Sequence, residues 1–119
     1  PVIPNQKDLF EGKNIIAVGS FKPDMRELPD VLSETVDQIF MDTDFAAKES
    51  GDLAIPLKNG TSKVSQLLTL GKLITGQVQL SDNPTTFFKS VGMALFDLVA
   101  ATLIYQKAKE QKLGTVVEM

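Results

Sequence analysis

Three short apolar runs along the chain have the pattern of buried β-strands. Residues 14–19 (NIIAVG) form a compact apolar run after a turn signal, and residues 38–42 (QIFMD) form a second one. Continuous runs of this kind suit strands that are covered on both faces, as in a parallel sheet. Residues 85–90 (TTFFKS) have the β-branched and aromatic bias of a third strand.

Helical segments are predicted between and after these runs. Residues 29–36 and 44–49 have the features of short helices, and residues 61–75 have apolar positions at helical spacing. The longest helix is predicted from residue 92 to about residue 112, whereas residues 53–55 form too short a run to assign. The first turns of this longest helix are apolar nearly all round, so we expect it to be deeply packed.

The order of these elements is strand, helix, strand, helix, helix, strand, helix. Such alternation indicates βαβ units and a parallel sheet covered by helices. The predicted fold is therefore α/β, a partial doubly wound (Rossmann-like) parallel sheet of three or four strands. We expect residues 1–119 to form a single domain, with strand and helix units over residues 1–90 and a long C-terminal helix and tail over residues 91–119.

Composition narrows the chemistry that is open to the chain. Its 119 residues are 43% hydrophobic and 23% charged, the balance of one folded globular domain. The sequence has no cysteine and no histidine, which excludes disulfides, thiolate metal sites and histidine-centred catalysis. Any acid–base catalysis would have to use Asp, Glu, Lys or Tyr105.

Charge and hydropathy bear on partners and location. The net charge of −3 argues against nucleic acid, because duplex binding relies on a basic stripe. The longest apolar stretch, residues 93–105, is interrupted by Asp97 and is too short for a bilayer span. The first residues show neither the basic nor the apolar region of a secretory signal. We therefore expect a cytoplasmic protein without a membrane or nucleic-acid partner.

Two turns follow predicted strands, where ligands bind in open α/β sheets. The loop over residues 19–23 (GSFKP) is either part of a cofactor or substrate site or a plain strand-to-helix turn. In the turn over residues 89–92 (KSVG), the Ser, the Gly and free N–H groups of the following helix are able to hold a polar ligand group. G-x-G-x-x-G occurs nowhere, so the chain has no complete dinucleotide-binding fingerprint of its own.

Several acidic residues have two interpretations. Residues 42–44 (DTD) resemble an Asp-x-Asp magnesium pair, but helix capping is the commoner use of such residues, and we predict no metal site. Glu49 and Asp52 flank a glycine turn, where they either bind the ammonium or imino nitrogen of a small substrate or are solvated at a helix end. For Asp97 we expect a structural hydrogen bond to a neighbouring loop.

Four segments stand in an order and spacing that is typical of one protein family. They are residues 18–28 (VGSFKPDMREL), Asp42 with residues 46–52 (AAKESGD), residues 70–76 (LGKLITG) and residues 86–94 (TFFKSVGMA). The first, third and fourth resemble the V-G-x-x-x-P-x-x-x-E-L, L-G-x-[VI]-[IL]-x-G and T-[VI]-F-[KD]-S-x-G-x-A patterns of the ornithine cyclodeaminase/mu-crystallin family. The second is similar to the matching segment of mu-crystallin, and the last match is the most specific.

The resemblance implies an NAD(P)-dependent enzyme that has a dimerisation and substrate domain beside a Rossmann domain. Family members include ornithine cyclodeaminases, alanine dehydrogenases and cyclic ketimine reductases. Only the C-terminal part of such a protein is matched, and the glycine-rich cofactor loop is expected upstream of Pro1. We therefore interpret the chain as a C-terminal fragment, whose cofactor is NAD or NADP.

The resemblance also implies roles for particular residues. Val18 corresponds to a cofactor contact, Ser90 and Val91 match the signature turn near the nicotinamide, and Glu49 matches a position that lines the substrate pocket in mu-crystallin. Phe21 departs from the cyclodeaminases and archaeal alanine dehydrogenases, which have an aspartate there. In the cyclodeaminases that aspartate acts on water and the imine intermediate. Phenylalanine neither accepts a proton nor orients water, so we identify no catalytic residue in this chain. Phe21 is instead expected to line the substrate pocket.

Three functions follow from these observations. Phe21 favours a cyclic ketimine reductase of amino acid metabolism, acting on Δ1-pyrroline-2-carboxylate or Δ1-piperideine-2-carboxylate, in which the cofactor carries the hard chemistry. The alternatives are an ornithine cyclodeaminase, which forms proline and ammonia with another carboxylate, and a non-catalytic remnant or binding protein. The chain alone is expected to be inactive. An open strand edge and exposed apolar surface predict self-association as a dimer.

Overall fold

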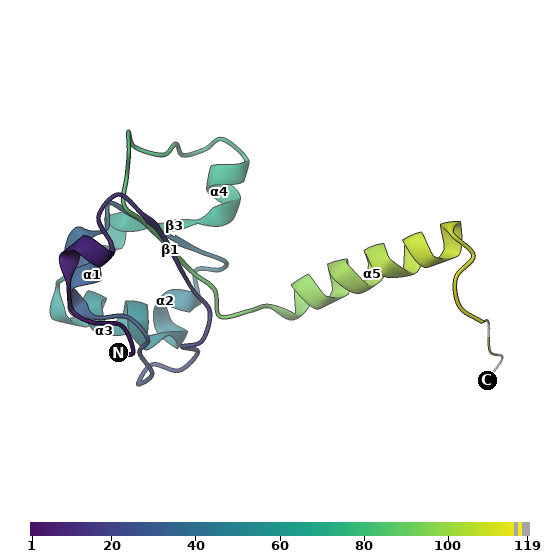
Figure 1. Cartoon of the computed structure of the whole chain (residues 1–119), viewed down its shortest axis with the longest axis horizontal. Helices are drawn as coiled ribbons and strands as arrows, with labels where there is room; N and C mark the ends of the chain where they lie inside the picture. Colours follow the sequence, from purple (N-terminus) through teal and green to yellow (C-terminus); the bar gives the residue numbers. More distant parts are fainter. Residues whose placement is uncertain (116, 118–119) are drawn as a thin grey trace.

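The computed structural model describes residues 1–115 and 117. The elements in chain order are the 3-10 helix η1 (Lys7–Leu9), β1 (Asn14–Ala17), α1 (Asp30–Thr35), β2 (Gln38–Met41), α2 (Ala46–Glu49), α3 (Gly51–Asn59), the 3-10 helix η2 (Val64–Gln66), β3 (Leu67–Thr69), α4 (Leu70–Ile74), β4 (Thr86–Lys89) and α5 (Ala94–Glu110). Figure 1 shows an α/β body from which α5 projects, and the principal extents are 57 × 32 × 24 Å.

The described residues contain one sheet of four parallel strands in the order β1-β4-β2-β3. The last strand along the chain, β4, is thus interior: Phe87 lies opposite Ile15 of β1 on one side and Ile39 of β2 on the other. In Figure 1, α1, α2 and α3 lie on one side of the sheet and α4 lies on the other. The parallel α/β sheet predicted from the sequence is confirmed.

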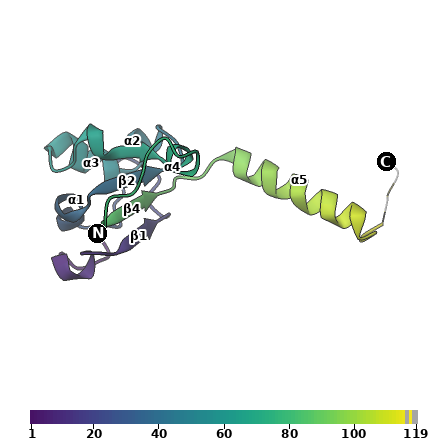
Figure 2. The ribbon, with the colours of Figure 1, turned by 90° about the horizontal axis from the view of Figure 1, so that it is seen from above.

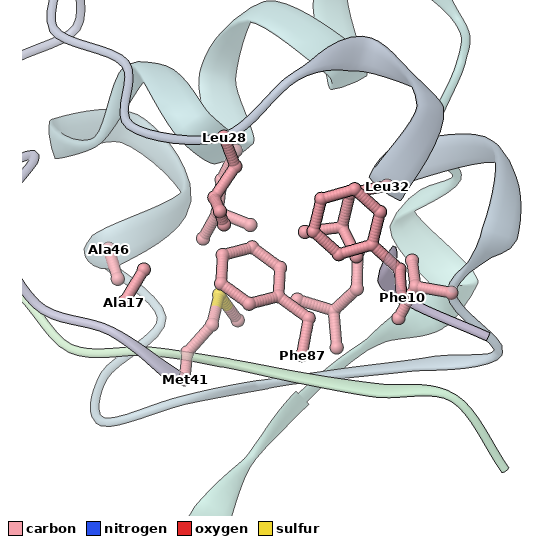
Figure 3. Close-up of a cluster of buried hydrophobic side chains, with 10 residues drawn as sticks. Phe10, Ala17, Leu28, Leu32, Met41, Ala46 and Phe87 are labelled. Atoms are coloured by element: carbon pink, nitrogen blue, oxygen red, sulfur yellow. The ribbon is translucent and has the colours of Figure 1, made fainter. Parts of the chain in front are cut away.

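The core lies between the sheet and the helices α1 to α3. Side chains at alternate strand positions, including Ala17, Met41 and Phe87, point to this face and pack against Leu28 and Leu32 (Figure 3). Each of the larger side chains, Met41, Phe87, Leu28 and Leu32, contributes roughly 1.5–3 kcal/mol by leaving water. The opposite face is open beside the edge strand β1, where Ile16 is 70% exposed.

The segment predicted as one helix over residues 61–75 is instead η2, β3 and α4. Its apolar residues fit both a helical and a strand period, and periodicity alone does not separate the two for a short run. Pairing decides the outcome, because Leu67–Thr69 lies in parallel register with Ile39–Met41 of β2. Residues 53–55, left unassigned from the sequence, belong to α3, where the Ser50 hydroxyl accepts a hydrogen bond from the Asp52 N–H (3.3 Å).

The expectation that the longest helix is deeply packed is wrong for the described residues. No residue of α5 is buried, and large side chains such as Leu98 (63% exposed) and Ile104 (68%) face solvent. Figure 2 shows α5 extending away from the sheet and its covering helices. The apolar pattern of the sequence indicates that the surface of α5 favours burial, but it does not identify the protein surface that would cover α5. No helix within residues 1–115 is long and apolar enough to cross a membrane.

We predict that Gly51→Ala destabilises the fold by about 1–3 kcal/mol, the usual cost of overpacking. A Cβ at Gly51 would lie 2.4 Å from the Met25 carbonyl oxygen and 2.7 Å from that of Pro23, and neither backbone atom is free to move away. Thermal or urea unfolding measures the effect. The matched control is Gly71→Ala in α4, where a Cβ meets nothing within 4 Å, so stability should be unchanged or slightly raised. Equal effects of the two substitutions would contradict the prediction.

Candidate functional site

The carboxyl ends of β1, β4 and β2 form one edge of the sheet. Two backbone hydrogen bonds just beyond the strands hold this edge together: the Ser90 N–H donates to the Ala17 carbonyl (3.2 Å), and the Asp42 N–H donates to the Lys89 carbonyl (3.3 Å). In open parallel sheets ligands bind at this edge, where the strand order leaves a crevice. The edge therefore collects the loop after β1, the turn after β4 and Asp42 after β2.

The loop over residues 18–28, called the β1–α1 loop below, is folded around its own glutamate. One carboxylate oxygen of Glu27 accepts hydrogen bonds from the N–H groups of Gly19 (2.8 Å) and Ser20 (3.0 Å). The Ser20 hydroxyl donates to the Met25 carbonyl (2.7 Å) and so closes the loop a second time. Partial burial raises the pKa of Glu27, but these N–H groups and the Lys89 ammonium outweigh that effect and hold it below its ordinary value.

The start of α3 holds the same loop from outside. One oxygen of the buried Asp52 carboxylate accepts the N–H groups of Glu27 (2.9 Å) and Leu28 (3.0 Å). The Gly51 N–H donates to the Lys22 carbonyl (2.9 Å). The hydroxyls of Ser20 and Ser50 share a hydrogen bond of 2.8 Å. The loop is thus a preformed wall of the edge, with hydrogen bonds at its start, middle and end.

The Lys89 ammonium connects β4 to both carboxylates. It lies 3.3 Å from a Glu27 oxygen and 3.4 Å from the Asp52 oxygen that receives no hydrogen bond. The Lys89 side chain is fully buried. The sequence suggested that Asp52 binds a substrate nitrogen or is solvated, and both interpretations are wrong. Asp52 is buried (4% exposed), and the ammonium beside it belongs to the protein.

Asp42 organises the turn after β4. One carboxylate oxygen accepts hydrogen bonds from the Ser90 hydroxyl (2.8 Å) and from the N–H groups of Val91 (2.9 Å) and Gly92 (2.9 Å). The other oxygen accepts the Thr43 N–H (2.8 Å). Partial burial raises the pKa of Asp42, but these four donors outweigh it and lower the pKa below its ordinary value.

The role of Asp42 corrects two expectations. Ser90 and Gly92, predicted to hold a polar ligand group with the first N–H groups of the following helix, instead donate to Asp42, as does the Val91 N–H, and the helix begins only at Ala94. The predicted use of residues 42–44 as a cap for the next helix is also wrong, because α2 has Phe45 at its N-cap and no side-chain cap. The described residues contain no group of three or more acidic side chains placed to hold a metal ion.

The sequence-predicted site residues lie around this edge to different degrees. Val18 (68% exposed) directly follows β1, and Ser90 and Val91 follow the neighbouring β4. Phe21 (55% exposed) lies on the β1–α1 loop, with the Lys22 ammonium 5.7 Å from its ring centre.

Glu49 and Asp97 lie apart from this arrangement. Glu49 is exposed at the end of α2, two residues before Gly51, whose N–H donates to the Lys22 carbonyl of the β1–α1 loop. Within residues 1–115, its carboxylate makes no hydrogen bond to the other four predicted site residues. Asp97 is exposed in the first turn of α5, without the predicted bond to a loop in the described chain.

The buried polar group of Glu27, Asp52 and Lys89 was not identified from the sequence as a functional unit. All three residues stand inside the segments that carry the family resemblance, which was the available signal. Nothing in their spacing of 25 and 37 residues along the chain shows that the side chains meet. The strand order brings them together, because it inserts β4 beside β1.

The parallel sheet, its covering helices and the polar carboxyl edge define a Rossmann-like α/β protein. More particularly, the chain belongs to the ornithine cyclodeaminase/mu-crystallin family, whose model matches residues 4–112. The resemblance inferred from the four sequence segments is thereby confirmed.

Similar proteins of this family include two kinds of reductase. A Δ1-pyrroline-2-carboxylate reductase of Bacillus cereus is 38% identical over 92% of the chain and 35% of its own length. The ketimine reductase mu-crystallin of Mus musculus is 40% identical over 79% of the chain and 28% of its own length. The structure of Thermococcus litoralis Δ1-pyrroline-2-carboxylate reductase with NADH and L-proline matches with a TM-score of 0.78 and 33% identity, over 90% of this chain and 34% of that one. The chain thus spans about a third of the length of these relatives.

We predict that Asp42→Asn lowers stability by about 1–3 kcal/mol at neutral pH, because hydrogen bonds to a charged acceptor become neutral ones. The native pKa of Asp42 is below its ordinary value, so its contribution is complete above about pH 4 and is lost as the pH falls through the native pKa. Unfolding free energy measured from pH 7 to pH 2 should therefore fall less steeply in Asp42→Asn than in the wild type. Asp44→Asn, at an exposed position of the same loop, is the control and should follow the wild-type curve. Identical slopes for wild type and Asp42→Asn would contradict the prediction.

Proposed function

We propose that these 119 residues form the C-terminal part of a Rossmann-type domain in an NAD(P)H-dependent cyclic ketimine reductase. Its substrate would be a cyclic imino acid such as Δ1-pyrroline-2-carboxylate or Δ1-piperideine-2-carboxylate. Membership of the family supports the proposal, as do two relatives that are named as reductases of this kind and span about three times the length of the chain. The solved reductase with NADH and L-proline supports a nicotinamide cofactor and a small amino or imino acid as ligands.

The observation that carries the proposal is the chemistry of the rim of the carboxyl edge. Phe21 stands exposed on the β1–α1 loop where cyclodeaminases of the family have an aspartate, so this position cannot activate water. Two other carboxylates of the edge, Glu27 and Asp42, are already engaged by backbone N–H groups. Reduction of a preformed imine needs no water and no base at this position, whereas deamination of ornithine does.

The residues of the edge suit the nicotinamide end of a dinucleotide better than its phosphates. The N–H groups of the turn after β4 are occupied by Asp42, so the turn presents Ser90 and the partly buried Val91 rather than an anion site. Val18, directly after β1, adds an apolar side chain next to this turn. When bound, the cofactor supplies hydride to the imine carbon. Val18, Ser90 and Val91 would orient its ring, while Phe21 and Glu49 would line the substrate side.

Ornithine cyclodeaminase activity is the alternative, and it would need another carboxylate in place of the aspartate. Glu49, exposed at the end of α2, is the residue matched to the substrate pocket that such a reaction would recruit. A non-catalytic binding role is the second alternative. For the reductase and for the cyclodeaminase, the proposed setting is amino acid metabolism in the cytoplasm.

The test is an assay with a longer protein that contains residues 1–119 after a glycine-rich dinucleotide loop. We expect oxidation of NADH or NADPH with Δ1-pyrroline-2-carboxylate, and none with residues 1–119 alone. Phe21→Leu should keep the activity, whereas Phe21→Asp should reduce kcat/KM by tenfold or more, because a carboxylate there repels the anionic substrate (~1.4 kcal/mol). Release of proline and ammonia from ornithine, with no oxidation of NADH or NADPH when Δ1-pyrroline-2-carboxylate is supplied, would support the cyclodeaminase instead, with a rate that Phe21→Asp leaves unchanged or raises.

We further propose that the chain self-associates as a dimer through α5. Its apolar side chains are exposed on several sides of the helix, and a shallow groove between Leu98, Val99 and Leu103 offers a seat for a second helix. An exposed apolar surface of this extent favours association in water.

Light scattering after gel filtration should give twice the 13.0 kDa monomer mass. Leu98→Glu with Leu103→Glu should shift the chain to a monomer, whereas Leu80→Glu, at an exposed apolar residue outside α5, should leave the dimer intact. A wild-type monomer at the same concentration would contradict the dimer. Association that survives the double substitution would place the contact elsewhere, for instance at the open edge of β1.

A further inference from the structure

Lys89 is a buried charged group that the proposed reaction does not use. It is the last residue of β4, and its side chain is completely buried on the same sheet face as Phe87, two positions earlier. An ammonium in such a place is costly unless it is paired. The fold meets this requirement with two carboxylates, Glu27 at 3.3 Å and Asp52 at 3.4 Å.

The two carboxylates act on opposite ends of the β1–α1 loop. Glu27 accepts the N–H groups of Gly19 and Ser20, where the loop begins. Asp52 accepts the N–H groups of Glu27 and Leu28, where the loop ends. The Lys89 ammonium lies between the two acceptors, so one charge fixes the positions of both loop ends.

This arrangement is tightly packed. A Cβ at Gly19 would lie 2.5 Å from a Glu27 carboxylate oxygen, so the glutamate is in close contact with the loop backbone. The Asp52 side chain is fully buried, which limits the geometries in which it can meet the ammonium. Without Lys89, two carboxylates would remain close together with no cation to offset their repulsion.

Lys89 also stands directly before Ser90 and Val91. The same residue that pins the β1–α1 loop therefore belongs to the strand that carries the turn after β4. Val18 and Phe21 lie on the pinned loop, and the Ser90 N–H already joins the turn to the end of β1 through the Ala17 carbonyl. Lys89 adds a second connection, which reaches the far end of the loop through Glu27 and Asp52.

We propose that Lys89 is a positioning residue, which holds the β1–α1 loop in register with the turn after β4 through Glu27 and Asp52. The inference rests on the proposed function only for its consequence, namely that the aligned walls seat the nicotinamide and the imine. The ordering of the loop is a property of the chain itself and is measured without substrate.

The experiment compares Lys89→Met with wild type by hydrogen exchange of individual backbone amides in residues 1–119. We expect the exchange of the Gly19, Ser20 and Leu28 amides to be accelerated at least tenfold more than that of Ile39 and Phe40 in the interior strand β2, whose rates report any general loss of stability. Lys58→Met, at an exposed lysine near the end of α3, is the matched control and should change none of them. Uniformly faster exchange throughout the sheet would assign Lys89 a general role in stability, and unchanged loop amides would remove it altogether; either result overturns the proposal.

Two additions keep the test decisive. If Lys89→Met does not fold, Lys89→Met with Asp52→Asn leaves no unpaired carboxylate in the fully buried position, and the same amides are compared. In the longer protein, loss of loop position should raise the KM for NADH or NADPH at least tenfold, with a smaller change in kcat. A loosened loop in a protein without reductase activity would refute the proposed function and leave this inference standing. An active enzyme with an unchanged loop and KM would do the reverse.

Discussion

A single buried ammonium organises the candidate site of this protein. Lys89 stands at the end of an interior strand, and the carboxylates that neutralise it come from the loop after β1 and from the start of α3. Buried ion pairs add little net stability, because desolvation cancels most of the attraction, but breaking one partner is expensive. The group therefore acts on conformation more than on total stability: it selects one arrangement of the loop over the others that the same backbone would allow.

The second constraint is the need of backbone N–H groups for acceptors. The turn after β4 leaves its N–H groups uncompensated until Asp42 accepts them, and the β1–α1 loop does the same until Glu27 accepts them. The carboxylates of Asp42 and Glu27 are therefore both engaged by backbone N–H groups. The apolar side chains of Val18 and Phe21 stand exposed on the same edge, with the Lys22 ammonium beside the Phe21 ring. In the proposed function, these apolar side chains would contact the nicotinamide and the substrate.

The exposed surfaces complete the description. One face of the sheet beside β1 and the apolar first turns of α5 remain open, although their side chains have the composition of a core. The chain spans about a third of the length of its relatives, and the proposals for a longer enzyme and for self-association both address how these apolar surfaces are covered.

The sequence by itself was sufficient for the class of fold, for the family and for the positions of β1, β2, β4 and α5 to within a few residues. Short apolar runs bounded by turn residues are local signals, and the family segments are linear patterns. It was not sufficient for β3, because Leu67–Thr69 fits a helical period equally well and becomes a strand only by pairing with β2. The covering of α5 was also misjudged, since hydropathy measures the preference of a side chain and not the presence of a partner.

Only the tertiary structure revealed what Asp42, Asp52 and Lys89 do. In the sequence, each is an ordinary polar residue of a turn or a strand end. In the structure, each binds atoms of residues that are about 25 to 60 positions away along the chain. Such contacts arise because β4 inserts between β1 and β2, which places three strand ends side by side. Electrostatic and hydrogen-bonding interactions depend on distance in space, and that distance is set by the strand order, which no local pattern encodes.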